Sequence, residues 1–84
     1  MAPPPYRVLW LEIAEQQYLD LPDENRALVD ERLAQLESDP LGLPGAVYDS
    51  PSDQWSAPIT EPGLLLYAVV PDPATVIVLR IIVL

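Results

Sequence analysis

Two residues in the last third of the chain, Tyr67 and Arg80, carry the side chains best suited to chemistry. A phenol can exchange a proton, and a guanidinium can hold a phosphate or another anion. Each residue also has a purely structural interpretation. Tyr67 would then be a core or rim tyrosine with a satisfied hydroxyl, and Arg80 would pair with a carboxylate while its stem packs on a sheet. The sequence leaves both interpretations open.

The remaining residues offer few catalytic or metal-binding groups. The chain has no histidine and no cysteine, which removes the usual general base, the commonest metal ligand and any disulfide. Asp49, Asp53 and Glu61 lie in predicted loops, and their spacing matches neither a calcium-binding loop nor a catalytic acid–base pair. We expect these carboxylates to serve loop capping and solubility. The sequence therefore predicts neither a cofactor nor a metal.

Trp55 and Arg7 are the candidate partner-binding residues. Trp55 follows a loop rich in glycine, proline and serine, and it could either anchor a partner or seal the edge of the core. Arg7 alternates with the apolar residues of the first predicted strand. It could join Arg80 in a small basic spot, or it could simply be solvated.

The closing stretch, residues 63–84, must position Tyr67 and Arg80. Two apolar runs flank the turn Pro71–Ala74, which predicts two antiparallel strands that lie at the centre of a sheet. The face that carries the even-numbered residues of 64–70 should pack against helices, and Tyr67 and Arg80 should be diagonal neighbours on the other face. The predicted register pairs Val70 with Thr75, Tyr67 with Val78 and Leu65 with Arg80.

The earlier residues predict the rest of one small domain, residues 6–84, after a disordered lead at residues 1–5. Residues 6–11 favour a strand in which Tyr6, Val8 and Trp10 share one face. Apolar spacing predicts helices over 12–21 and 23–37. Short extended pieces follow at 46–48 and 55–60, the second an edge strand because of Pro58. This order predicts an α+β fold: a small, largely antiparallel sheet, with two helices on one face and three or four strands after them.

Charge and length narrow the possible partners. The 84 residues carry a formal net charge of −9, with four arginines and no lysine, which opposes binding to nucleic acid and to anionic membranes. A basic partner is the natural electrostatic complement. No signal peptide or membrane-spanning run is expected, so the predicted location is the cytoplasm. So short a chain could also gain stability from a second copy of itself.

Four motifs occur in order along the chain: Tyr6-x-Val8-x-Trp10, the break at Leu21-Pro22, Leu36-x-x-Asp39-Pro40 and Gly63-x-x-x-Tyr67. Together with the predicted order of elements, they resemble the RelE/ParE toxins of bacterial type II toxin–antitoxin systems. The resemblance covers roughly residues 6–84 and rests on element order and spacing. It implies a small antiparallel sheet with two helices on one face, an antitoxin as partner, and either ribosome-dependent cleavage of messenger RNA or poisoning of DNA gyrase.

The chain departs from the family where the chemistry resides. The segment before Tyr67 is Leu64-Leu65-Leu66, where the family often carries an arginine, and Arg80 is the only basic residue of the closing strands. RNA cleavage without a metal needs a base, an acid and positive charge, of which Tyr67 and Arg80 could supply fragments. The resemblance thus implies a toxin that acts through protein binding, with weak or no nuclease activity, and an antitoxin segment that is basic or apolar. The alternatives are a ribosome-dependent endoribonuclease that uses Tyr67 and Arg80, and a non-toxic homodimeric interaction module.

Overall fold

The computed structural model describes residues 6–59 and 63–83, and in this part of the chain it has two helices and five strands. This confirms the predicted α+β class and the predicted order of elements. The lead predicted at residues 1–5 lies outside the described residues. Neither helix of the described part is long and apolar enough to cross a membrane. The elements are β1 (Arg7–Trp10), α1 (Glu12–Leu19), α2 (Asp23–Ser38), β2 (Val47–Asp49), β3 (Gln54–Pro58), β4 (Gly63–Pro71) and β5 (Ala74–Val83).

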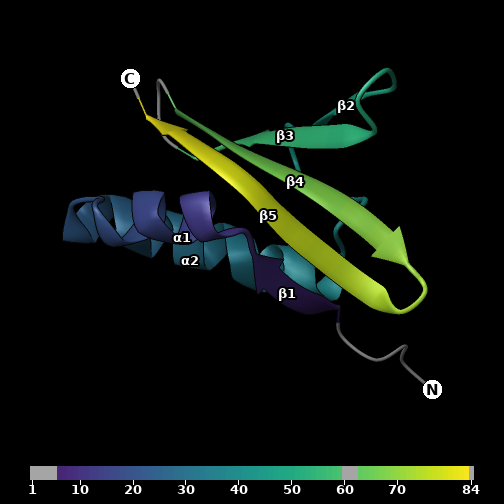
Figure 1. Cartoon of the computed structure of the whole chain (residues 1–84), viewed down its shortest axis with the longest axis horizontal. Helices are drawn as coiled ribbons and strands as arrows, with labels where there is room; N and C mark the ends of the chain where they lie inside the picture. The colour runs from purple at the N-terminus through teal and green to yellow at the C-terminus, as the bar shows by residue number, and fades with distance from the viewer. Residues whose placement is uncertain (1–5, 60–62, 84) are drawn as a thin grey trace.

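The strands form one sheet in the order β1-β5-β4-β3-β2 (Figure 1). The two closing strands, β4 and β5, lie at its centre, as predicted. The sheet is mixed rather than fully antiparallel, because β1 pairs with β5 in parallel. Parallel neighbours need a long connection, and here it is supplied by the helices and the other three strands.

The prediction that residues 55–60 form an edge strand is wrong, because β2 pairs with the outer side of β3. The pairing ends at Val47 opposite Ser56, so Pro58 lies beyond the reach of β2. Its missing N–H therefore costs no hydrogen bond in the β2–β3 ladder. The proline marks an edge, but only for the last part of the strand.

The register between β4 and β5 is as predicted next to the turn and shifts further along. Val70 pairs with Thr75 and Tyr67 with Val78, but a bulge follows, and Arg80 pairs with Leu66 instead of Leu65. One extra residue in β5 changes the face to which all later side chains of that strand point. Tyr67 and Arg80 therefore lie on opposite faces of the sheet, and the prediction that they are diagonal neighbours is wrong.

The helices cover one face of the sheet, where α1 contacts β5 and α2 contacts β1 (Figure 1). The covered face carries Leu65 and Tyr67, so the prediction that the even-numbered residues of 64–70 face the helices is wrong. Both faces of β4 are apolar, and alternation alone could not tell which one the helices would cover. Tyr6, Val8 and Trp10 share the covered face, as predicted. The core consists of Ala14, Val29, Leu36, Leu43, Ala57, Ile59, Leu65, Tyr67, Val76, Val78 and Ile81.

Candidate functional site

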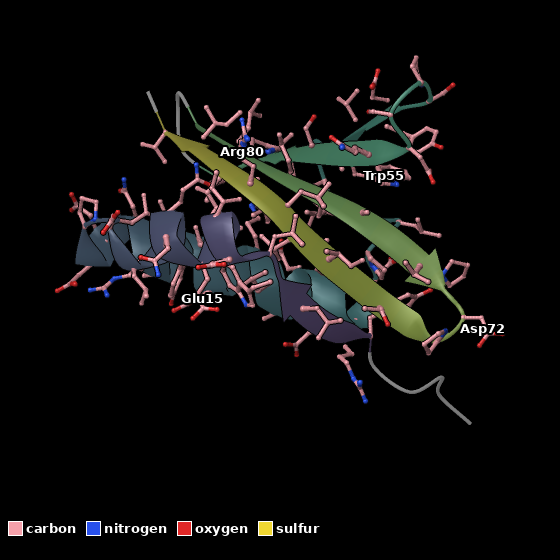
Figure 2. All side chains as sticks on the ribbon, in the orientation of Figure 1. Glu15, Trp55, Asp72 and Arg80 are labelled. Atoms are coloured by element: carbon pink, nitrogen blue, oxygen red, sulfur yellow. The ribbon has the colours of Figure 1, made fainter. Side chains whose placement is uncertain are left out.

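Arg80 lies on the face of the sheet that the helices leave open (Figure 2). Its side chain is exposed, and its cross-strand partner Leu66 is only partly buried. The two residues border a hollow of about 360 Å³ that runs across β5 and β4, from the start of α1 to the start of β3. The hollow is lined by Leu11, Ile13, Gln54, Leu66, Leu79, Arg80 and Ile82.

The open sheet face around Arg80 is strongly apolar. Leu9 at one side of the sheet is 47% exposed and Leu64 near its centre 40% exposed, so large apolar side chains reach solvent across several strands. Contiguous apolar surface of this kind is uncommon on isolated proteins and marks interaction sites. We define the open sheet face as Arg7, Leu9, Ser56, Leu64, Leu66, Ala68, Val70, Ile77, Leu79, Arg80 and Ile82.

Arg80 has no carboxylate partner among the residues that the structure describes. The ion pair found there joins Arg26 to Asp23 on α2, far from the sheet face. The structural interpretation, in which a nearby carboxylate neutralises Arg80, therefore finds no partner among the described residues and stays a prediction. The guanidinium stands as a single positive charge at the rim of an apolar hollow, which suits an anionic group brought by a partner.

Tyr67 lies in the core instead of beside Arg80. Its side chain is fully buried, and its hydroxyl has no hydrogen-bond partner among the described residues. Burial raises the pKa of the Tyr67 phenol above its ordinary value. The structure thus favours the core interpretation of Tyr67, although the hydroxyl is not satisfied as that interpretation expected.

Trp55 belongs to a row of three aromatic rings on the covered side of the sheet. Its ring stacks on Tyr67 at 6.4 Å between centroids and lies 5.0 Å from the ring of Tyr48. Trp55 is partly buried against the core, so it seals the sheet toward β2 (Figure 2). Its proposed role as a partner anchor stays a prediction. The hydroxyl of Tyr48 donates a hydrogen bond to Asp53, and this bond raises the pKa of Tyr48.

Arg7 is exposed at the start of β1 and does not join Arg80. Arg7 pairs with Thr75, which lies five residues before Arg80 along β5. Strand geometry separates these positions by about 16 Å. Each arginine therefore acts alone, and the basic spot that the sequence allowed is not formed.

Sequence reasoning missed the apolar residues of the hollow, because it assigned the even-numbered residues of β4 to the core. The charge of Arg80 gave no sign of the error, because strict alternation placed Arg80 with Val76 and Val78 on the face expected to lie away from the helices. The structure buries Val76 and Val78 and exposes Arg80, and the bulge between them accounts for the difference.

The chemistry available at the hollow is that of binding. Among its lining residues only Gln54 and Arg80 have polar side chains, and neither is a general base at neutral pH. One guanidinium can hold a carboxylate or a phosphate, while the surrounding leucines and isoleucines bury apolar surface of a partner.

Comparison with solved structures identifies the fold. A chain of the RelBE2 toxin–antitoxin complex from Mycobacterium tuberculosis superposes with a TM-score of 0.75 and 25% identity, over 94% of this chain and 91% of that one. The YoeB/ParE toxin from Agrobacterium tumefaciens gives a TM-score of 0.79 at 14% identity, over 89% of this chain and 94% of that one. The archaeal RelE–RelB complex from Pyrococcus horikoshii gives 0.75 at 17% identity, over 96% and 93%.

The chain therefore has the fold of the RelE/ParE toxin superfamily, which confirms the fold that the resemblance implied. No protein-family model matches the sequence, and a comparison with curated proteins found no match. The shared property is the arrangement of elements, and activity has to be argued from the surfaces of this chain.

Proposed function

We propose that this chain is the toxin component of a type II toxin–antitoxin pair and that it acts through protein contacts, with weak or no nuclease activity of its own. The observation that carries the proposal is the open sheet face, which is largely apolar and has two well-separated guanidinium groups, Arg80 at the hollow and Arg7 at the start of β1. An apolar surface with isolated charges suits a protein partner. The similarity to chains of toxin–antitoxin complexes supports the choice of an antitoxin as that partner.

The electrostatics support protein binding over RNA binding. Binding to a nucleic-acid backbone depends on several clustered cations, and each phosphate contact contributes separately to affinity. The open sheet face offers two such cations, Arg7 and Arg80, about 16 Å apart, on a chain of net charge −9. The antitoxin segment that covers it should be largely apolar, with basic residues where it passes the acidic helices.

The test combines expression and complex formation. The chain is expressed under tight control in a bacterial host, alone and together with the product of the neighbouring gene, while growth and bulk translation are followed. We expect growth arrest that the neighbouring product relieves, and an equimolar complex by size-exclusion chromatography. Normal growth with well-folded protein, or an equimolar mixture that elutes as two separate species, would contradict the proposal.

A second function is favoured by the exposure of Arg80. A ribosome that holds the messenger RNA and supplies the missing acid and base would need only a positive charge from this chain, so a ribosome-dependent endoribonuclease is the alternative. Tyr67 is left out of this alternative because its side chain is buried. In that case Arg80→Gln should abolish messenger RNA cleavage in a translating extract while the variant stays folded. Absence of cleavage by the unsubstituted chain would exclude the alternative, and unchanged cleavage by the folded variant would exclude the role of Arg80 in it.

A further inference from the structure

We infer that a groove on the helical side of the molecule, away from the open sheet face, binds an arginine side chain of the protein partner. The groove lies where the end of β1 meets α1 and α2, and it has a volume of about 480 Å³. We call it the helical groove. Its lining residues are Trp10, Glu15, Tyr18, Leu19, Asp30 and Leu33.

Two aromatic rings line the helical groove. Trp10 and Tyr18 are 5.1 Å apart between centroids and tilted by 56°, and both residues are only partly buried. A cation that lies over the face of an aromatic ring is attracted by the ring quadrupole, so this lining suits a cationic group. Leu19, which is 54% exposed, adds an apolar wall along which an aliphatic stem can pack.

Two carboxylates stand at the groove. Asp30 is exposed and accepts a hydrogen bond of 2.6 Å from the Tyr18 hydroxyl, which orients the carboxylate and leaves its second oxygen available. Glu15, the second carboxylate that lines the groove, is exposed on α1 (Figure 2). Among the described residues no cation pairs with either carboxylate. The hydrogen bond to Asp30 is the largest cause of the raised pKa of Tyr18.

The helices carry few cations of their own. The stretch 12–39 has nine acidic side chains and only two arginines. The charge of Arg26 reaches Tyr18, where it acts to lower the pKa, but the ion pair of Arg26 is with Asp23. Arg32 donates its hydrogen bonds to the carbonyl oxygen of Pro58 and to Gln35. The two groove carboxylates thus make no ion pair among the described residues, and a cation from another molecule would complement them.

Arginine fits this site better than lysine. Its planar guanidinium can stack on an indole or phenol ring while its edge donates paired hydrogen bonds to a carboxylate. Lysine offers a compact, strongly hydrated ammonium, which loses more hydration when it lies on a ring. That the arginine belongs to an antitoxin rests on the proposed function, whereas the chemistry of the groove does not.

The test uses a small probe, so that it does not depend on any antitoxin. The full chain, labelled with ¹⁵N, is titrated with N-acetyl-arginine amide, and the indole N–H signals of its two tryptophans are followed by NMR. We expect the Trp10 signal to shift along a saturable curve while the Trp55 signal stays in place. N-acetyl-citrulline amide, which has the same shape without the charge, should cause no saturable shift.

Two double variants locate the interaction. Glu15→Gln with Asp30→Asn removes both groove carboxylates but keeps an acceptor for the Tyr18 hydroxyl, and it should weaken probe binding by about threefold to tenfold. Glu24→Gln with Glu31→Gln removes the same charge from exposed positions of α2 outside the groove and should leave binding nearly unchanged.

Three results would overturn the inference: equal shifts at both tryptophans, equal binding of the citrulline probe, or equal weakening by both double variants. Each of these results can be obtained whether or not the chain arrests growth. Growth arrest together with a Trp10 signal that does not shift would reject arginine binding at the groove and support the proposed function. A Trp10 signal that shifts, without growth arrest, would support arginine binding and contradict the proposed function.

Discussion

Replacement of Tyr67 by phenylalanine should stabilise the protein. The Tyr67 side chain is fully buried, and its hydroxyl finds no hydrogen-bond partner among the described residues. A buried hydroxyl without a partner has lost its hydrogen bonds to water and gained nothing in exchange. Phenylalanine removes that group and keeps the ring that stacks on Trp55.

The expected gain is about 1 kcal/mol in the free energy of unfolding. An unsatisfied buried polar group costs about 1–3 kcal/mol. Loss of the oxygen leaves a small void, and at about 24 cal/mol per Å³ this void reduces the gain in stability by a few tenths of a kcal/mol. For a domain of this size, a gain of about 1 kcal/mol corresponds to a rise of about 4–8 °C in the melting temperature.

The measurement is urea unfolding followed by far-ultraviolet circular dichroism, together with a thermal scan. Tyr48→Phe is the matched control, because Tyr48 belongs to the same aromatic row but is exposed, with a hydroxyl that donates to Asp53. Its free energy of unfolding should change by no more than about 0.5 kcal/mol. The slope of the unfolding curve with urea should stay the same in both variants.

Destabilisation of Tyr67→Phe by about 1 kcal/mol or more would refute this reasoning, because it would mean that the hydroxyl makes a favourable hydrogen bond. The same variant separates structure from catalysis. If the toxic effect were lost while stability rose, Tyr67 would have a role in activity that its burial does not suggest. If the effect persists, the tyrosine serves only the core.

Three further predictions follow from the same structure. Three tyrosines have a raised pKa in the folded chain, so above pH 10, the ordinary phenol pKa, the unfolded chain loses phenolic protons before the folded one. The stability that these tyrosines contribute is complete below that pH and should fall as the pH rises, less steeply in Tyr67→Phe. Urea unfolding from pH 8 to 11.5 measures the change. Leu36→Ala should lower the free energy of unfolding by about 2–5 kcal/mol, because Leu36 is fully buried. Leu41→Ala should lower it by under about 1 kcal/mol, because Leu41 is 59% exposed, and thermal scans compare the two variants. Arg80→Gln should change stability by less than about 0.5 kcal/mol, yet weaken the antitoxin complex in a binding titration, because Arg80 is exposed and the described residues give it no partner.

The general architecture could be predicted because local signals agreed with one another. The apolar runs on either side of Pro71–Ala74 specified a central hairpin, and the spacing of Val29, Leu33 and Leu36 specified a helix. The parallel pairing of β1 with β5 could not be predicted in the same way. It depends on where the helical hairpin returns the chain, which no local pattern records.

The candidate site could not be predicted because its signals are ambiguous by nature. β4 is apolar on both faces, so alternation does not say which face the helices cover. A single extra residue in β5 then moves Arg80 to the face opposite Tyr67. The helical groove was also missed, because it joins Trp10 to Asp30 across the packing of β1, α1 and α2.

The two surfaces together restrict what kind of molecule can cover this protein. A protein that makes about 6–10 phosphate contacts binds nucleic acid with an affinity that falls steeply with salt, whereas two separated guanidinium groups can make only about two such contacts. The acidic side chains of the helices repel the same phosphates. A polypeptide has no such conflict, because it can bring a carboxylate to Arg80, apolar residues to the open sheet face and an arginine to the helical groove. The few, separated cations of the open sheet face therefore agree with the proposal that a protein of mixed charge, and not RNA, covers this surface.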